Sequence, residues 1–172
     1  DRPYYEGQIA DERTLSGREA AYLAEYGFED LLVAYPIYQY SDILGIRDAL
    51  EAGTTVTTMV DSVEHVRRLS ELGEEFDTTF PLCLDIDLST KHFGLHFGVR
   101  RSGIRDADAA LALCDQITEL PAVTVAGVMG YEAQLAGIPD RAPSNNRLEN
   151  AAIRALKRRS RKLVRRRRVD VV

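Results

Sequence analysis

The stretch LLVAYPIYQYSDILGIRDALEAGTTVTTMV, residues 31–60, holds two β-strand patterns separated by one helix pattern. Residues 31–35 form a short apolar run, and residues 54–60 are rich in β-branched side chains. Between them, residues 41–52 have helical spacing and are closed by Gly53. Strands this apolar need cover on both faces, so the stretch predicts parallel strands joined by a crossover helix.

The same alternation continues on both sides of this stretch. Upstream, residues 16–26 form a helix pattern that opens with Ser16 and Glu19 at capping-box spacing and stops at Gly27. A short strand is expected before it, at residues 7–10. Downstream, helices and strands are predicted in alternation over residues 62–72, 80–88, 106–120, 123–129 and 148–168, with Ser62 and Gly73 bounding the first of these helices.

Two parallel architectures satisfy this order of elements, the doubly wound open sheet and the (β/α)8 barrel. A full barrel needs roughly 250 residues, so five strands in a chain of 172 residues correspond to about five of its eight units. The segment Gly127-Val128-Met129-Gly130 lacks the third glycine of a dinucleotide fingerprint, and the sequence contains no P-loop. We therefore favour an α/β fold that is an incomplete TIM-type barrel with right-handed crossovers.

Composition narrows the class of protein. The chain is 45% hydrophobic and 28% charged, as in globular proteins, and no apolar run approaches the ~20 residues of a membrane helix. Cys83 and Cys114 have no metal-type spacing and are expected to be small buried side chains in a reducing compartment. We expect a cytoplasmic protein without a membrane partner. Because the chain starts at Asp1 without an initiator Met, we also expect residues upstream of it.

Two further clusters indicate no specific chemistry. Ten Arg or Lys residues fall within residues 154–168, but apolar residues at helical spacing and the lack of interleaved aromatic residues favour a solvated outer helix over a nucleic-acid surface. The histidines His65, His92 and His96 form no zinc-binding pattern, and the last two lie in what reads as a loop. We therefore expect neither a nucleic-acid partner nor a metal site.

Polar residues gather where two of the predicted strands end, which is where parallel α/β folds place their sites. Asp85 and Asp87 alternate along one strand and therefore point to the same face. Two buried carboxylates are costly unless they are paired. One interpretation is an ion pair with Arg100 or Arg101, and the other is that the strand carries a polar group into a site.

The second strand end is VAGVMGYEAQ, residues 125–134, in which an apolar strand runs directly into Tyr131, Glu132 and Gln134. A tyrosine here can lie flat against a planar ligand, and Gln134 can form a hydrogen bond with it. The alternative interpretation is a tyrosine at the rim that covers the core.

Four segments, in this order, resemble the pyridoxal-phosphate enzymes of the alanine racemase type (fold type III), especially the branch with D-threonine aldolase and related amino-acid deaminases. They are DLLVAYP at residues 30–36, LDIDL at 84–88, FGVRRS at 97–102 and GVMGYEAQ at 127–134 with residues 137–140 after it. The resemblance implies that residues 1–172 are part of a pyridoxal-phosphate-binding barrel, with strands two to six of the family barrel. It also implies a separate C-terminal β domain in the family that this chain does not include.

The resemblance further implies pyridoxal phosphate as the cofactor and an amino acid as the substrate. The activity would be that of an aldolase, a deaminase/dehydratase or a racemase, acting through a cofactor-stabilised carbanion at Cα. Tyr131 is similar in place to the family's ring-stacking residue, and Gln134 follows closely enough to contact the cofactor or substrate. Asp87 and Arg101 match an acid and a downstream arginine near the cofactor ring, and Arg100 is a rival for that arginine. The catalytic residues are not assigned.

The family's cofactor-linking lysine lies on the first barrel strand, which the resemblance does not cover. The lysines of this chain, Lys91, Lys157 and Lys162, do not match it, so we expect this segment alone to be inactive. A homodimer is one expected state, because family members are often dimers and an incomplete barrel exposes strand edges. Two alternatives stay open: a non-catalytic pyridoxal-phosphate-binding barrel of the homeostasis type, and an unrelated barrel enzyme with phosphorylated substrates.

Overall fold

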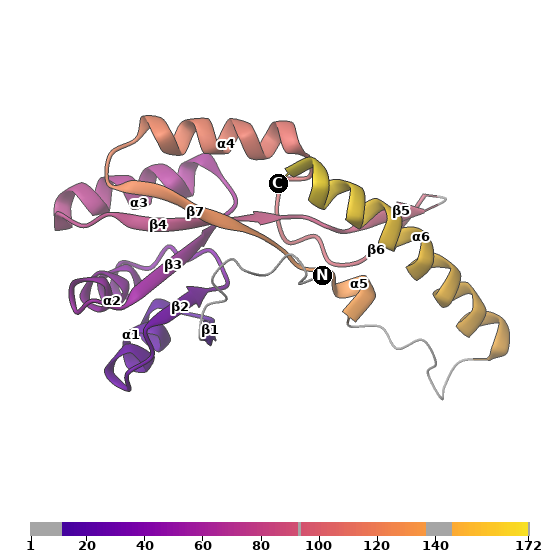
Figure 1. Cartoon of the computed structure of the whole chain (residues 1–172), viewed down its shortest axis with the longest axis horizontal. Coiled ribbons are helices and arrows are strands. Elements are labelled where there is room, and N and C mark those ends of the chain that lie inside the picture. The colour runs from indigo at the N-terminus through magenta and orange to yellow at the C-terminus, as the bar shows by residue number, and fades with distance from the viewer. Residues whose placement is uncertain (1–11, 93, 137–145, 172) are drawn as a thin grey trace, which may run out of the picture. The chain divides into compact units, whose positions relative to one another are not determined.

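The computed structural model describes residues 12–92, 94–136 and 146–171, except for the side chains of residues 12, 13, 95, 134 and 136. The strand predicted at residues 7–10 lies outside the described residues. In chain order the elements are β1 (Glu12–Thr14), α1 (Gly17–Glu25), β2 (Asp30–Val33), α2 (Tyr40–Glu51), β3 (Thr55–Val60), α3 (Val63–Phe76), β4 (Phe80–Ile86), β5 (Thr90–His92), β6 (Leu95–Phe97), α4 (Ala107–Glu119), β7 (Val123–Gly130), α5 (Ala133–Ala136) and α6 (Arg147–Val171) (Figure 1).

The main sheet has its strands in the order β1-β2-β3-β4-β7, and the pairings from β1 to β4 are parallel. Leu31 of β2 lies opposite Val56 of β3, and Met59 of β3 lies opposite Cys83 of β4. Each of β1 to β3 is followed by a helix before the next strand begins, as the sequence predicts. The α/β class with a parallel sheet is therefore confirmed, and β1 adds a short polar strand that the hydrophobic pattern does not indicate.

The chain divides into two compact units. The first unit comprises residues 1–84 and 113–128, and the second comprises residues 85–112 and 129–172. In the first unit the described strands and helices bury a continuous set of apolar side chains, among them Leu31, Val33, Ile43, Ile46, Val56, Met59, Leu69, Phe80 and Leu82. The second unit contains the β5–β6 hairpin, α6 and the segment that follows β4.

Local capping explains where the first helices begin and end. The Ser16 hydroxyl accepts a hydrogen bond from the Glu19 amide at 3.2 Å, and Ser62 caps α3 in the same way. Gly27 has φ of +88° directly after the C-cap of α1, a conformation that costs glycine little. Both N-caps predicted from the sequence are confirmed.

Gly73 does not end α3, contrary to the prediction. The helix continues to Phe76, and Asp77 ends it with φ of +53°. A Cβ at position 73 would lie 2.7 Å from both the Ala122 side chain and the Thr78 carbonyl oxygen. This glycine therefore permits close packing within the first unit, which is a use that local sequence does not distinguish from a helix stop.

His92 and His96 lie on a β-hairpin, so the prediction of a loop is wrong. β5 and β6 pair antiparallel with His96 opposite Lys91, and Gly94 has φ of +82° in the turn. The hydroxyls of Thr90 and Ser160 lie 2.8 Å apart, and the His92 Nε2 lies 2.9 Å from the Ser160 hydroxyl. The hairpin is thus stabilised by a buried polar cluster with α6, a contact that the hairpin sequence does not reveal.

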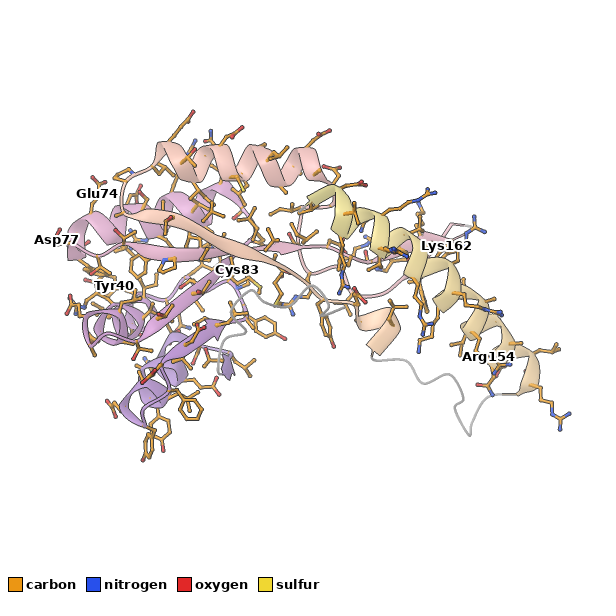
Figure 2. The ribbon with its side chains drawn as sticks, viewed as in Figure 1. Tyr40, Glu74, Asp77, Cys83, Arg154 and Lys162 are labelled. Carbon is orange, nitrogen blue, oxygen red and sulfur yellow. The ribbon has the colours of Figure 1, made fainter. Side chains whose placement is uncertain are left out.

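α6 is amphipathic. Lys157, Ser160 and Val164 are its buried residues, whereas most of its arginines are exposed. Figure 2 shows Arg154 and Lys162 projecting from this helix.

No helix in the described part of the chain is long and apolar enough to cross a membrane. Both cysteines are free. Cys83 is buried as expected, whereas Cys114 is only half-buried, and this partial burial raises the pKa of its thiol.

Candidate functional site

The candidate site lies in the second unit, at the end of β4. Asp85 and Asp87 are each only 1% exposed. The chain returns along this strand end after the hairpin, because Ile86 and Ile104 form a parallel bridge and the Asp87 amide donates to the Ile104 carbonyl at 2.8 Å. The two carboxylates therefore stand beside residues 100–105, a segment rich in arginine.

Asp85 is paired with Arg101. The Arg101 Nε donates to the Asp85 Oδ2 at 3.1 Å, and the arginine side chain is 14% exposed. The guanidinium carbon of Arg101 also lies 5.5 Å from the ring centroid of Tyr131, which is a cation–π contact. Residues from three separate segments thus form one stack, with a buried carboxylate, a fixed cation and an aromatic ring in that order.

Asp87 has different partners. Its Oδ1 accepts a hydrogen bond from the Ser89 amide at 2.8 Å, and its Oδ2 lies 3.3 Å from the Nε of Arg105. Arg105 is more than half exposed, so this pair is open to water on one side. The structure therefore brings Asp85, Arg101 and Tyr131 together and gives Asp87 a separate arginine that the sequence analysis did not single out.

The structure separates the two rival arginines. Arg100 is exposed and its Nε donates weakly to the Nδ1 of His96 at 3.4 Å, whereas Arg101 faces the buried carboxylate of Asp85. The interpretation of an ion pair between one strand carboxylate and one of these arginines is confirmed for Asp85 and Arg101. The role of Asp87 and Arg101 toward a cofactor stays a prediction.

Tyr131 directly follows β7 and is 43% exposed, so part of its ring surface is open. Gly130 before it allows a close approach, since a Cβ there would lie 2.8 Å from the Leu88 Cγ. Gln134 falls in α5, and its side chain is outside the described residues.

Of the three lysines, Lys91 is exposed on β5, Lys157 is buried on α6, and Lys162 is exposed on α6.

The chemistry that this arrangement offers is orientation of a planar ligand. The Asp85 carboxylate balances the charge of Arg101 and fixes the direction of its guanidinium. The open part of the Tyr131 ring can stack against a flat ring system. Such a surface fits an aromatic cofactor, because an aromatic face and an immobilised cation lie next to each other.

Comparison with known proteins identifies the family. Residues 16–170 match the family described as alanine racemase, N-terminal domain. The chain belongs to this family. The resemblance read from the sequence is therefore confirmed, and with it the interpretation of the fold as part of a TIM-type barrel.

The individual proteins that this chain resembles are distant from it in sequence. The chain is 24% identical over 117 residues to the 3-hydroxy-D-aspartate aldolase of Paracoccus denitrificans (strain Pd 1222), covering 68% of this chain and 28% of the aldolase. The D-threonine aldolase of Filomicrobium marinum aligns with a TM-score of 0.65 and 16% identity, over 92% of this chain and 38% of that one.

A third similar protein is the D-threo-3-hydroxyaspartate dehydratase of Delftia sp. HT23, with a TM-score of 0.61 and 16% identity over 88% of this chain and 36% of that one. At this identity the structural matches support the fold alone. The chain spans 28% of the length of the curated relative and less than two fifths of each of these two solved structures.

Proposed function

We propose that this chain is part of a pyridoxal-phosphate-dependent enzyme that acts on amino acids. The observation that carries the proposal is the stack of Asp85, Arg101 and Tyr131 where β4 and β7 end, in a domain of the alanine racemase N-terminal family. When bound, pyridoxal phosphate supplies an electron sink for negative charge at the substrate Cα.

The proposal assigns each side chain a simple role. The open part of the Tyr131 ring stacks against the cofactor ring, and Arg101 lies beside it with its guanidinium held by Asp85. Asp87 stabilises the loop after β4 through the Ser89 amide and Arg105. Gln134 is proposed to contact cofactor or substrate from α5.

The names of the similar proteins suggest a substrate class. An aldolase for 3-hydroxy-D-aspartate, a D-threonine aldolase and a D-threo-3-hydroxyaspartate dehydratase all act on D-amino acids that carry a hydroxyl on Cβ. Aldol cleavage breaks the Cα–Cβ bond and gives glycine plus an aldehyde. Dehydration removes the Cα proton and the Cβ hydroxyl, and hydrolysis of the product then releases a 2-oxo acid and ammonia. Racemisation removes and returns the Cα proton only.

The remaining parts of the proposal concern the setting. A cytoplasmic location agrees with two free cysteines, one of them buried. A homodimer, with an amino acid as the only other partner, is proposed on the family resemblance.

The test uses the complete protein that carries these residues. The purified protein is incubated with pyridoxal phosphate, reduced with borohydride and weighed by mass spectrometry. It is then assayed with D-threonine and with both diastereomers of 3-hydroxy-D-aspartate for glycine, aldehyde, 2-oxo acid and ammonia. One cofactor adduct together with one of these product sets is the expected result.

Two other outcomes are informative. A cofactor adduct without turnover of any amino acid would support a non-catalytic binding protein instead of an enzyme. A protein that gives neither an adduct nor an absorbance change with pyridoxal phosphate would contradict the proposal. The 172-residue chain assayed in parallel is expected to give no product, because its three lysines do not match the family's cofactor-linking lysine.

A further inference from the structure

Arg167 of α6 binds the loop that follows β4. Its Nη1 donates hydrogen bonds to two backbone carbonyls, that of Asp87 at 2.5 Å and that of Ser89 at 3.1 Å. The same loop is also held by the hydrogen bond from the Ser89 amide to the Asp87 carboxylate. One arginine from a distant part of the sequence therefore satisfies two carbonyls at the strand end that carries Asp85 and Asp87.

The next residue of the same helix reaches the other strand end. Arg168 forms an ion pair with Glu132, which directly follows Tyr131. Consecutive residues of an α-helix project about 100° apart, so two neighbouring arginines can reach in two directions from one turn. Arg167 contacts the loop that begins at the end of β4, and Arg168 contacts Glu132, two residues past the end of β7.

Two other contacts show that the segments after β4 and at the end of β7 lie close together and that α6 packs against the β5–β6 hairpin. Leu88 packs against Gly130 so tightly that a Cβ at position 130 would collide with it. About two helical turns before the arginine pair, Ser160 contacts the hairpin through its buried hydrogen bonds with Thr90 and His92. The arginine pair therefore projects from a helix whose position is set independently of it.

We propose that Arg167 and Arg168 are positioning residues that hold the two strand ends of the candidate site in register. Their contacts with the Asp87 and Ser89 carbonyls and with Glu132 hold the backbone that carries Asp87 and Tyr131. This inference rests on the proposed function, because the geometry that they hold is the stack that receives the cofactor ring. Displacement of either strand end by even 1 Å would weaken the stacking contact.

Arg165 provides a matched control. It lies on the same helix and is exposed, and within the part of the chain that the structure describes its side chain forms no ion pair. Replacement of Arg165 therefore changes net charge and helix propensity as replacement of Arg167 does, without touching either strand end.

The experiment compares Arg167→Ala, Arg168→Ala and Arg165→Ala in the complete protein. In the apo form, hydrogen exchange measured by mass spectrometry should become faster in the peptide around residues 85–90 for R167A and around residues 129–133 for R168A. The dissociation constant for pyridoxal phosphate, measured by absorbance titration, should rise about tenfold in R167A and about threefold in R168A, since the part-buried bonds of Arg167 are less open to water than the ion pair of the half-exposed Arg168. R165A should stay within twofold of the unchanged protein in both measurements.

Rescue variants separate positioning from general damage to the fold. Arg167→Lys keeps a donor that can reach a carbonyl and should recover part of the cofactor affinity. The double variant Glu132→Arg with Arg168→Glu restores the ion pair with reversed polarity and should bind cofactor better than either single variant. Recovery of this kind is not expected if the arginines merely support the overall stability of α6.

The outcomes distinguish this inference from the proposed function. If the unchanged protein binds no pyridoxal phosphate, the proposed function fails, whereas the exchange data on the apo protein still report whether the pair holds the strand ends. If the unchanged protein binds the cofactor but R167A and R168A match R165A in both exchange and affinity, the positioning role is overturned.

Discussion

Asp85 places a carboxylate inside the second unit, where its side chain is almost inaccessible to water and faces Arg101. Replacement by asparagine would leave the guanidinium of Arg101 without its balancing charge in a largely buried position. Asp85→Asn should therefore lower the free energy of unfolding by about 3 kcal/mol, measured by urea denaturation followed with circular dichroism. It should also lower cofactor affinity in the complete protein, because Arg101 would lose its fixed direction beside Tyr131.

Asp115→Asn is the control for this change. Asp115 is exposed on α4, so its replacement should alter the free energy of unfolding by no more than about 0.5 kcal/mol. Equal effects of the two substitutions would mean that the Asp85–Arg101 pair contributes no more than an exposed charge.

His65 makes stability depend on pH. Its ring is fully buried in the first unit, and its Nε2 lies 2.6 Å from the Ile37 carbonyl oxygen. Burial lowers the pKa of His65, and the bond to Ile37 and the charge of Asp61 offset part of that effect. Below a pH of about 6.5, the unfolded chain binds a proton at His65 that the folded chain resists. The free energy of unfolding should therefore fall as pH decreases below this value and stay level with respect to this group above it.

The measurement is a series of urea unfolding curves between pH 5 and 7.5. The His65 contribution can reach about 1.4 kcal/mol per pH unit for one proton difference. His65→Asn should flatten the slope, while His96→Asn, a change on the exposed side of the hairpin, should leave it unchanged. His92, whose pKa burial also lowers, accounts for a remaining slope of the same sign.

At the residue level the sequence predicts part of the site. Because burying an unpaired charge is costly, an ion pair is predicted for one of the strand carboxylates, and Asp85 forms one with Arg101. The choice of Arg101 over Arg100 depends on the β5–β6 hairpin, which the hydrophobic pattern does not show. Arg105 was missed because its contact with Asp87 follows from the bridge between Ile86 and Ile104, a pairing without a sequence signal.

At the scale of elements, the close approach of α1 to α2 requires a glycine at position 17. A Cβ at Gly17 would lie 2.6 Å from the carbonyl carbon and 2.9 Å from the Cα of Asp42, which are backbone atoms that cannot turn away. Gly17→Ala should force the two helices apart and lower the free energy of unfolding by about 2 kcal/mol, measured by urea denaturation. Gly103→Ala, where a Cβ would meet open space, should be tolerated, and a similar loss in both variants would argue against close helix packing as the cause.

Helices and buried strands were predictable because their signals are local. Ser16 and Ser62 cap the helices that they were expected to cap, and β-branched residues form β3 as expected. The hairpin was not predictable, since its stabilising partner Ser160 lies on α6, far along the chain. Gly73 was misread for the same reason, because the neighbour that requires a glycine there is Ala122.

At the scale of the whole molecule, the exposed apolar side chains of β7 favour association with another surface. Of the strands that the structure describes, β1 and β7 end the order of the main sheet. Val125 and Val128 of β7 are 39% and 40% exposed, although strands of parallel sheets are usually covered on both faces. The D-threonine aldolase and the dehydratase that align with this chain are each more than twice its length.

The 172-residue chain on its own should therefore self-associate, because an uncovered apolar strand at the end of a sheet is a template for pairing with another copy. Size-exclusion chromatography with light scattering should show a mass above 19.2 kDa that increases with protein concentration. Val128→Lys places a charge on the exposed strand and should shift the population toward the monomer, whereas Val169→Lys on α6 should not, although Val169 is the more exposed of the two valines. A monomer at every concentration, or an equal response to both lysines, would show that β7 is not the associating surface.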